Sequence, residues 1–310
     1  MSDQGGNLKS WQMRERLVRQ YQLPSCGWLY DGAIPDGIVT MSALRGEDEE
    51  IIGGAGEGAA AMPVLREVLE RLVPLPSRPD GKPIRHKHLL FSDWLALLFN
   101  FFAFSYGSQM SFRAKCPLCK QTPPEPVSKD ISDIPCTVYE EEPGFSRATF
   151  REPFKTRPLP PYDDVIDFRL LRVEDQLAAE SYYRQAQQVG KTGDVVRTFA
   201  TARHIVGVNG EPVTSFEAID YVRNAATGAT LATLRSEISE REPGYFMAVP
   251  LTCPLCGGSY DVRLPEDGSF FRSVDSQHRK SQAAKIFDAK LRAGGFDVPG
   301  LGGDDTVAEG

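Results

Sequence analysis

The stretch SDWLALLFNFFAFSYG, residues 92–107, decides the fold of this chain. It is apolar on nearly every side of a helix, a pattern typical of a helix in the middle of a core. Ser92 suits an N-cap and Gly107 a helix stop, so we predict the central buried helix between them. The longest apolar run, residues 94–104, is shorter than the roughly 20 residues that cross a bilayer. No membrane partner is therefore expected.

On the N-terminal side of this helix, one further strong helix is predicted. Residues 63–72 place apolar side chains at the spacing of one helical face, and prolines follow directly. Weaker patterns predict a short amphipathic helix at 11–21, a brief strand at 38–41 and a flexible glycine-rich loop at 53–58.

On the C-terminal side the sequence becomes helical again. Four helices are predicted, over residues 173–189, 194–204, 214–222 and 230–239. Thr214 and Glu217 have the spacing of a capping box at the start of the third helix. A turn at 208–212 and a strand at 246–249 complete this half.

We therefore expect an α+β fold, mostly helical, whose short strands form a pair of zinc knuckles with a helical insertion between them. The expected parts are an N-terminal helical extension (1–22), a body with the central apolar helix and the first knuckle (23–168), the helical insertion (169–241), the second knuckle hairpin with a C-terminal helix (242–294), and a mobile tail (295–310).

The motif CPLC occurs twice, once with Cys116 and Cys119 and once with Cys253 and Cys256. Each is predicted to be a tight turn whose backbone amides stabilise thiolates, and two such turns supply the tetrahedral ligand set that zinc prefers. Four thiolates leave no open position for water, so one structural Zn²⁺ ion is expected. A redox pair or an iron–sulfur cluster would use the same residues, but nothing else in the sequence indicates electron transfer.

The other cysteines and the histidines are assigned structural roles. Cys26 and Cys136 lack partners at ligand spacing and are predicted to be buried free thiols. His86 and His88 are expected in a solvated loop, and His278 on an exposed helix face. His204 is expected at the C-terminus of a helix, where a cation complements the helix dipole.

No catalytic pattern stands out in the sequence. The glycines of residues 53–58 lack the Lys-Ser/Thr of a phosphate loop, and an enzyme hypothesis rests only on His86, His88 and nearby Asp93. We therefore expect a protein that is not an enzyme.

Charge argues against a nucleic-acid partner. The chain carries 35 Lys and Arg against 42 Asp and Glu, for a formal net charge of −7, so no overall field attracts phosphate backbones. The polar residues 1–9 lack the apolar core of a secretory signal, and cytoplasmic synthesis is expected.

Five segments form an ordered series: LPSCGWLY (23–30), SDWLALLFNFFAFSYGSQM (92–110), CPLC at Cys116, CPLC at Cys253, and LPEDGSFF (264–271). The series resembles the baseplate hub assembly family of T-even-type contractile-tailed bacteriophages. It covers both ends of the chain and not the middle. The chain departs from the family by having Asn100-Phe101-Phe102 where family helices often carry an arginine, by its proline-rich loop, and by a long N-terminal extension.

The resemblance implies a non-enzymatic protein that binds baseplate hub or wedge subunits, either as an assembly chaperone or as a retained baseplate component. It would act in the host cytoplasm during assembly and, if retained, in the virion. The alternative is a zinc-ribbon protein that binds nucleic acid, because paired knuckles of this kind are widespread in such proteins.

Overall fold

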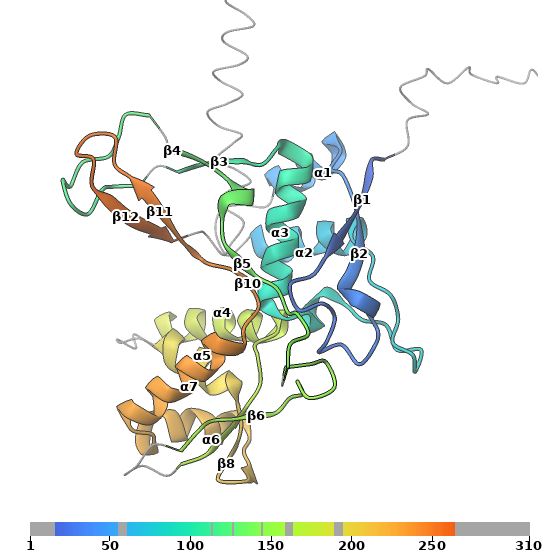
Figure 1. Ribbon diagram of the computed structural model, residues 1–310, viewed down its shortest axis with the longest axis vertical. Coiled ribbons are helices and arrows are strands. Elements are labelled where there is room, and N and C mark those ends of the chain that lie inside the picture. Colours follow the sequence, from blue (N-terminus) through green and yellow to red (C-terminus); the bar gives the residue numbers. More distant parts are fainter. Residues whose placement is uncertain are drawn as a thin grey trace, which may run out of the picture. The chain divides into compact units, whose positions relative to one another are not determined.

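A computed structural model describes residues 16–54, 61–112, 114–125, 127–143, 145–158, 164–188 and 195–263. All of them belong to one compact unit, Met1–Ser269, and the second unit, Phe270–Gly310, lies outside the described residues. The fold is mixed α/β (Figure 1). Among the residues described, no helix is both long and apolar enough to span a membrane.

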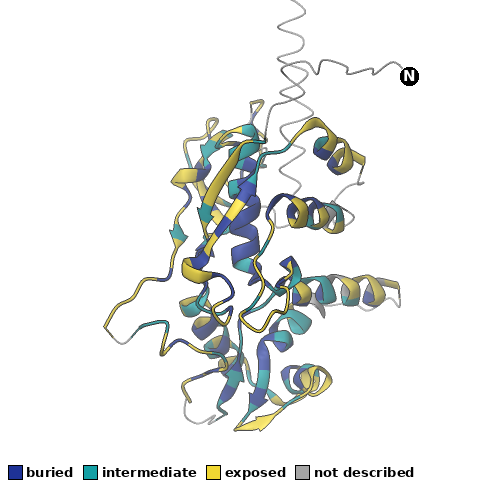
Figure 2. Cartoon of the chain, turned by 90° about the vertical axis from the view of Figure 1, so that its right-hand side faces the viewer, coloured by how far each residue is buried: buried dark blue, intermediate teal, exposed yellow. Residues whose placement is uncertain are grey.

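Helix α3 (Phe91–Tyr106) is the buried helix that the sequence predicts. Ten of its 16 residues are buried, and it is dark blue along most of its length in Figure 2. Gly107 ends it with a φ of +99°, a conformation that glycine adopts readily. The N-cap is Leu90 rather than Ser92, a correction to the prediction. Backbone hydrogen bonds tie residues 89–91 in extended form to residues 171–173, so the helix begins earlier.

The N-terminal segment is a strand where a helix was predicted. β1 (Val18–Gln22) pairs antiparallel with β2 (Ile38–Ser42), the strand that was expected. The helix prediction is thus wrong for residues 18–21, and residues 11–15 lie outside the described part. The residues of β1 pair with residues about 16 to 24 positions later in the sequence, and such tertiary pairing overrides a weak local helical pattern.

Two helices follow β2. α1 (Gly46–Gly54) includes the first two glycines of the predicted loop at 53–58, so that prediction is wrong at its start. The reason is that acidic residues in the first turn favour the helix N-terminus, where the Asp48 carboxylate accepts from the Arg45 N–H at 2.8 Å. α2 (Ala61–Leu72) is the predicted helix, and its apolar face is buried.

Short antiparallel pairs carry the cysteine motifs. β3 (Gln109–Phe112) pairs with β4 (Val127–Asp130), and β11 (Ala248–Thr252) pairs with β12 (Ser259–Arg263). The first CPLC lies between β3 and β4 and the second between β11 and β12. β5 (Cys136–Thr137) pairs with β10 (Gly244–Tyr245), and the predicted strand at 246–249 begins only at Ala248, as β11.

The remaining elements comprise helices around a four-stranded sheet. α4 (Val173–Gln188), α5 (Val195–His204), α6 (Ser215–Asp220) and α7 (Gly228–Arg241) occupy the predicted regions. The capping box of Thr214 and Glu217 is present. Residues 169–241 also contain β8 (Ile205–Val208) and β9 (Glu211–Pro212), which join β7 (Ile166–Phe168) and β6 (Phe154–Lys155) in the order β6-β7-β8-β9. This segment is therefore not purely helical.

Candidate metal centre

The four predicted ligands come together. The sulfur atoms of Cys116, Cys119, Cys253 and Cys256 all lie within 4.8 Å of one another. The Sγ of Cys116 lies 3.9 Å from that of Cys256, and the Sγ of Cys119 lies 3.8 Å from that of Cys253. Each close pair thus joins the two motifs. All six cysteines of the chain are free thiols.

The sulfur spacing fits one four-coordinate ion. Metal–sulfur bonds of about 2.3 Å in a tetrahedron place the sulfur atoms about 3.8 Å apart. The two shortest separations, 3.8 and 3.9 Å, match this value. A disulfide would need sulfur atoms only about 2 Å apart. The four-cysteine cluster could therefore hold one metal ion.

The two CPLC turns are built alike. In the first turn, Lys120 N–H donates to the Cys116 carbonyl and Cys116 N–H donates to the Gln121 carbonyl, both at 2.9 Å. In the second, Gly257 donates to the Cys253 carbonyl at 2.8 Å and Cys253 to the Gly258 carbonyl at 2.9 Å. The centre is pseudo-symmetric, as the repeated motif suggests.

The environment differs among the four thiols. Cys116 and Cys253 are fully buried, whereas Cys256 is exposed. Burial would raise the pKa of Cys116, but the backbone N–H groups of Cys119 and Leu118 lower it to about 7. The Gly258 N–H lowers the pKa of Cys256, yet burial and the neighbouring sulfurs raise it to about 11. One thiol thus ionises readily, and an ion would displace the protons of the others.

Two neighbours close the centre. A Cβ at Gly258 would lie 2.3 Å from Leu118 Cδ1, so the absence of a side chain there lets the two turns approach. Tyr260 on β12 is buried, and its hydroxyl has no hydrogen-bond partner among the described residues. Burial, followed by the charge of the cysteines, raises the pKa of Tyr260.

His204 ends α5, as predicted, but His86 and His204 are buried, and His88, predicted to be solvated, is half-buried. His86 is only 2% exposed instead of solvated, and its Nε2 lies 2.8 Å from the Val73 carbonyl, because residues 86–88 form a 3-10 turn against the end of α2. His204 is buried with Nδ1 2.8 Å from the Arg169 carbonyl. Burial lowers the pKa of His204 to about 4, so it is a neutral residue and not a cationic cap. His278 lies outside the described residues.

The two remaining cysteines are half-buried rather than fully buried. Cys26 Sγ lies 3.1 Å from the Tyr139 carbonyl, and burial raises the pKa of Cys26. Burial also raises the pKa of Cys136, to about 11. Neither belongs to the four-cysteine cluster.

Asp93, a member of the enzyme hypothesis, is fully buried and bonds to other partners than the histidines. Its carboxylate accepts from the Ser25 N–H at 2.9 Å, from the Ser25 hydroxyl at 2.5 Å and from the Tyr30 hydroxyl at 2.6 Å. Burial raises the pKa of Asp93. Sequence reasoning did not pair these residues, although an aspartate within an apolar helix signals a buried partner.

Comparison with known proteins adds no relative: no family model, no curated protein and no solved structure matches the chain. The fold and the site define a mixed α/β protein with a four-cysteine centre that could bind one metal ion.

Proposed function

We propose that the protein is a non-enzymatic, zinc-stapled subunit-binding protein of a contractile phage tail baseplate. The observation that carries the zinc assignment is the closed set of four sulfur atoms from two hairpin turns. Four thiolates at this spacing favour zinc and leave no position for a reacting water, so the ion is structural. The zinc knuckles are the turns at residues 116–121 and 253–258.

The ion would join parts of the chain that are far apart in sequence. Cys119 and Cys253 are separated by 134 residues, and α4 to α7 lie between them. Because the unfolded chain has no preformed site, the binding free energy of the ion would add to the free energy of folding. A zinc staple between the hairpin after α3 and the β11–β12 hairpin would hold this part of the fold together.

The baseplate assignment rests on the resemblance to the hub assembly family. Two of its motifs, residues 23–30 and the α3 segment, contact each other through Ser25, Tyr30 and Asp93, which supports their serving one structural purpose. The proposed partners are baseplate hub or wedge subunits. The side chains of Leu118 and Leu255 at the turn tips are 60% and 47% exposed, which suits contact with a protein.

The test is to tag the full chain in infected cells, identify what co-purifies during assembly, and look for the polypeptide in purified virions. If tail subunits co-purify but the polypeptide is absent from virions, the protein is an assembly chaperone. If tail subunits co-purify and the polypeptide is present in virions, it is a retained baseplate component. If no tail subunit co-purifies and the polypeptide is absent from virions, the baseplate proposal is overturned and the zinc-ribbon alternative takes its place. Cys136→Ser, outside the cluster, is the control for Cys116→Ser, which should reduce co-purification by destabilising the fold.

The zinc-ribbon alternative is favoured by one observation, the pair of CPLC turns held on hairpins. The net charge of −7 counts against it. Binding to DNA that falls steeply with added salt would support this alternative, since counterion release accompanies each phosphate contact.

A further inference from the structure

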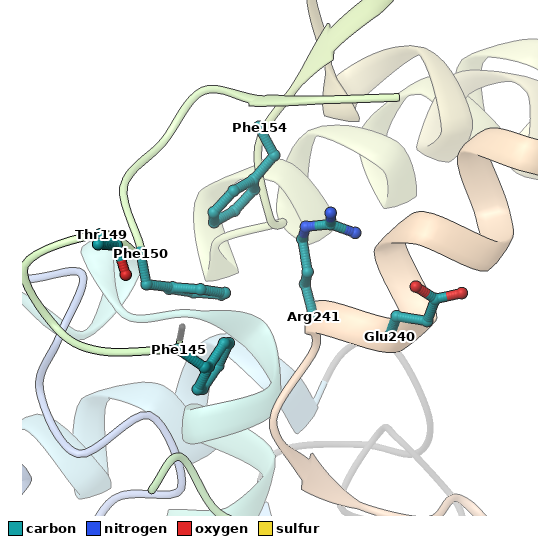
Figure 3. Close-up of a pocket in the computed structure, with 6 residues that line it drawn as sticks. All are labelled: Phe145, Thr149, Phe150, Phe154, Glu240 and Arg241. Atoms are coloured by element: carbon teal, nitrogen blue, oxygen red, sulfur yellow. The ribbon is translucent and has the colours of Figure 1, made fainter. Parts of the chain in front are cut away.

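An aromatic pocket lies away from the cysteines. It has a volume of about 370 Å³ and is bounded by residues 145–154 and the end of α7. Figure 3 shows its lining residues: Phe145, Thr149, Phe150, Phe154, Glu240 and Arg241. Three phenyl rings form one side, and a guanidinium group and a carboxylate from α7 form the other (Figure 3).

The aromatic side is held by packing. The ring centroids of Phe145 and Phe150 lie 4.9 Å apart, and those of Phe150 and Phe154 lie 4.7 Å apart. Behind them, Tyr139 lies 4.8 Å from Phe150, and Trp28 lies 5.3 Å from Phe145. Because the rings brace one another, the apolar surface exists before any ligand arrives, which reduces the cost of ordering it.

The guanidinium group of Arg241 is fixed but has unused donors. Its Nη1 donates to the Glu237 carbonyl at 2.9 Å and also to the Glu237 carboxylate, and its carbon lies 5.7 Å from the Phe154 ring centroid. Within the described part of the chain, its Nε and Nη2 make no hydrogen bond. An arginine held in this way presents two parallel N–H donors, the arrangement that binds a carboxylate.

The carboxylate in the pocket is already engaged. Glu240 accepts from Arg157 Nη2 at 3.0 Å and from the Ser236 hydroxyl at 3.3 Å. On the loop beside the pocket, Arg147 and Arg151 form no ion pair with any described residue. Three exposed carboxylates, Glu140 to Glu142, precede Phe145, so the preference for an anionic ligand rests on the unused donors of Arg241 and not on the net local charge.

We propose that this pocket binds a segment of a partner protein in which a phenylalanine lies next to a carboxylate side chain. The ring packs on the side of the pocket that Phe145, Phe150 and Phe154 form, and the carboxylate accepts from Nε and Nη2 of Arg241. The volume of about 370 Å³ is at the small end of ligand sites and suits one aromatic side chain with its neighbour. This proposal rests on the proposed function in one respect: it takes the ligand to be part of a partner protein.

The test uses the purified full-length protein and four peptides. These are Ac-Gly-Phe-Glu-Gly-NH2, its Gln analogue, its Lys analogue, and Ac-Gly-Ala-Glu-Gly-NH2. Titration followed by NMR or calorimetry should show saturable binding of the first peptide, with the Gln analogue weaker by about tenfold because the charge-assisted pair is lost. The Lys and Ala peptides should bind least. Equal binding of the Glu and Gln peptides, or no binding of the first at millimolar concentration, overturns the proposal.

Variants locate the binding. Arg241→Gln should weaken the Phe-Glu peptide about tenfold while leaving the Gln peptide unchanged. Arg235→Gln removes the same charge from α7 outside the pocket lining and is the matched control. Because Arg241→Gln also removes a partner of Glu237, Thr149→Trp provides a second variant that fills the exposed edge of the pocket and keeps Arg241. Full peptide binding by a folded Thr149→Trp protein contradicts the proposal.

The outcomes separate this site from the proposed function. Peptide binding without tail subunits in the co-purification would keep the pocket and overturn the baseplate partner. Co-purification of tail subunits without peptide binding would keep the proposed function and reject this pocket as the contact.

Discussion

Lys120 and Gly257 occupy equivalent positions, one residue after the second cysteine of each turn, and share a left-handed backbone, with φ of +61° and +70°. Each donates its N–H to the carbonyl of the first cysteine in its turn. A side chain in this conformation costs about 1 kcal/mol, a cost that glycine avoids. The first turn therefore contains backbone strain that the second does not.

Gly257→Ala should lower the free energy of unfolding by about 1 kcal/mol. The cost is purely conformational, since a Cβ at Gly257 would meet no atom within 4 Å. Lys120→Gly should be neutral or stabilising by up to about 1 kcal/mol, because relief of strain is partly offset by the freedom of glycine in the unfolded chain. Urea unfolding at a fixed zinc concentration measures both. A destabilising Lys120→Gly with a neutral Gly257→Ala would contradict this description of the turns.

Replacing a ligand cysteine should remove the ion and the stability that it adds. Cys116→Ser and Cys253→Ser should each cut the bound metal to well below one equivalent and lower the free energy of unfolding by more than about 4 kcal/mol. Cys136→Ser, outside the cluster, should change neither quantity by much. Metal analysis and thermal unfolding provide the readouts, and a folded Cys116→Ser protein with a full equivalent of zinc would show that the ligands are wrong.

Asp93 should be sensitive to loss of its charge. The Asp93 carboxylate accepts two hydrogen bonds from Ser25 and one from the Tyr30 hydroxyl, so the NH2 group of an amide in its place would face a donor. Asp93→Asn should lower the free energy of unfolding by about 3 kcal/mol, and Tyr30→Phe by about 1 to 2 kcal/mol. Asp133→Asn is the control, because Asp133 is exposed and 3.9 Å from Lys129. Equal losses for Asp93→Asn and Asp133→Asn in urea unfolding would contradict the prediction.

Stability should fall in mild acid through His204. Burial lowers the pKa of His204 in the folded state from 6.5 to about 4. The hydrogen bond with the Arg169 carbonyl and the charge of Asp175 raise this pKa, and the charge of Arg169 lowers it. A depressed pKa means that the contribution is complete above pH 6.5 and is lost as the pH falls toward 4. Between pH 7.5 and 5 this amounts to about 2 kcal/mol.

The comparison for this prediction is His204→Gln, whose side-chain amide can still donate to the Arg169 carbonyl. Urea unfolding at several pH values should show a smaller loss between pH 7.5 and 5 for the variant than for the wild type. The pKa of His86 is also lowered by burial, so some loss should remain in the variant. An identical pH dependence for both proteins would show that His204 does not ionise as described.

Strong local patterns were predictable from the sequence, and the tertiary contacts were not. The apolar run of α3, the one-sided spacing of α2 and the capping box at Thr214 each define an element within a few turns of chain. β1 depends on pairing with β2, a partner outside its local window, and its own residues suit helix or strand.

The same distinction holds for the site. The spacing within each CPLC motif predicts a ligand pair, and the duplication predicts that two pairs share one ion. The burial of His86 and His204 could not be predicted, because it depends on tertiary contacts with the Val73 and Arg169 carbonyls that no local pattern marks. The pocket around Arg241 is formed by residues 145–154 and the end of α7, which are about 90 residues apart in the sequence. No local sequence pattern connects two segments so far apart.

The most direct test of the central claim is the metal content of the purified full-length protein, combined with the absorption spectrum after cobalt replaces the native ion. The four-cysteine centre predicts one zinc per chain and the thiolate-to-cobalt bands of a tetrahedral four-sulfur site, both lost in Cys253→Ser. A folded protein without bound metal, in which all six cysteines react freely with a thiol reagent, would contradict it.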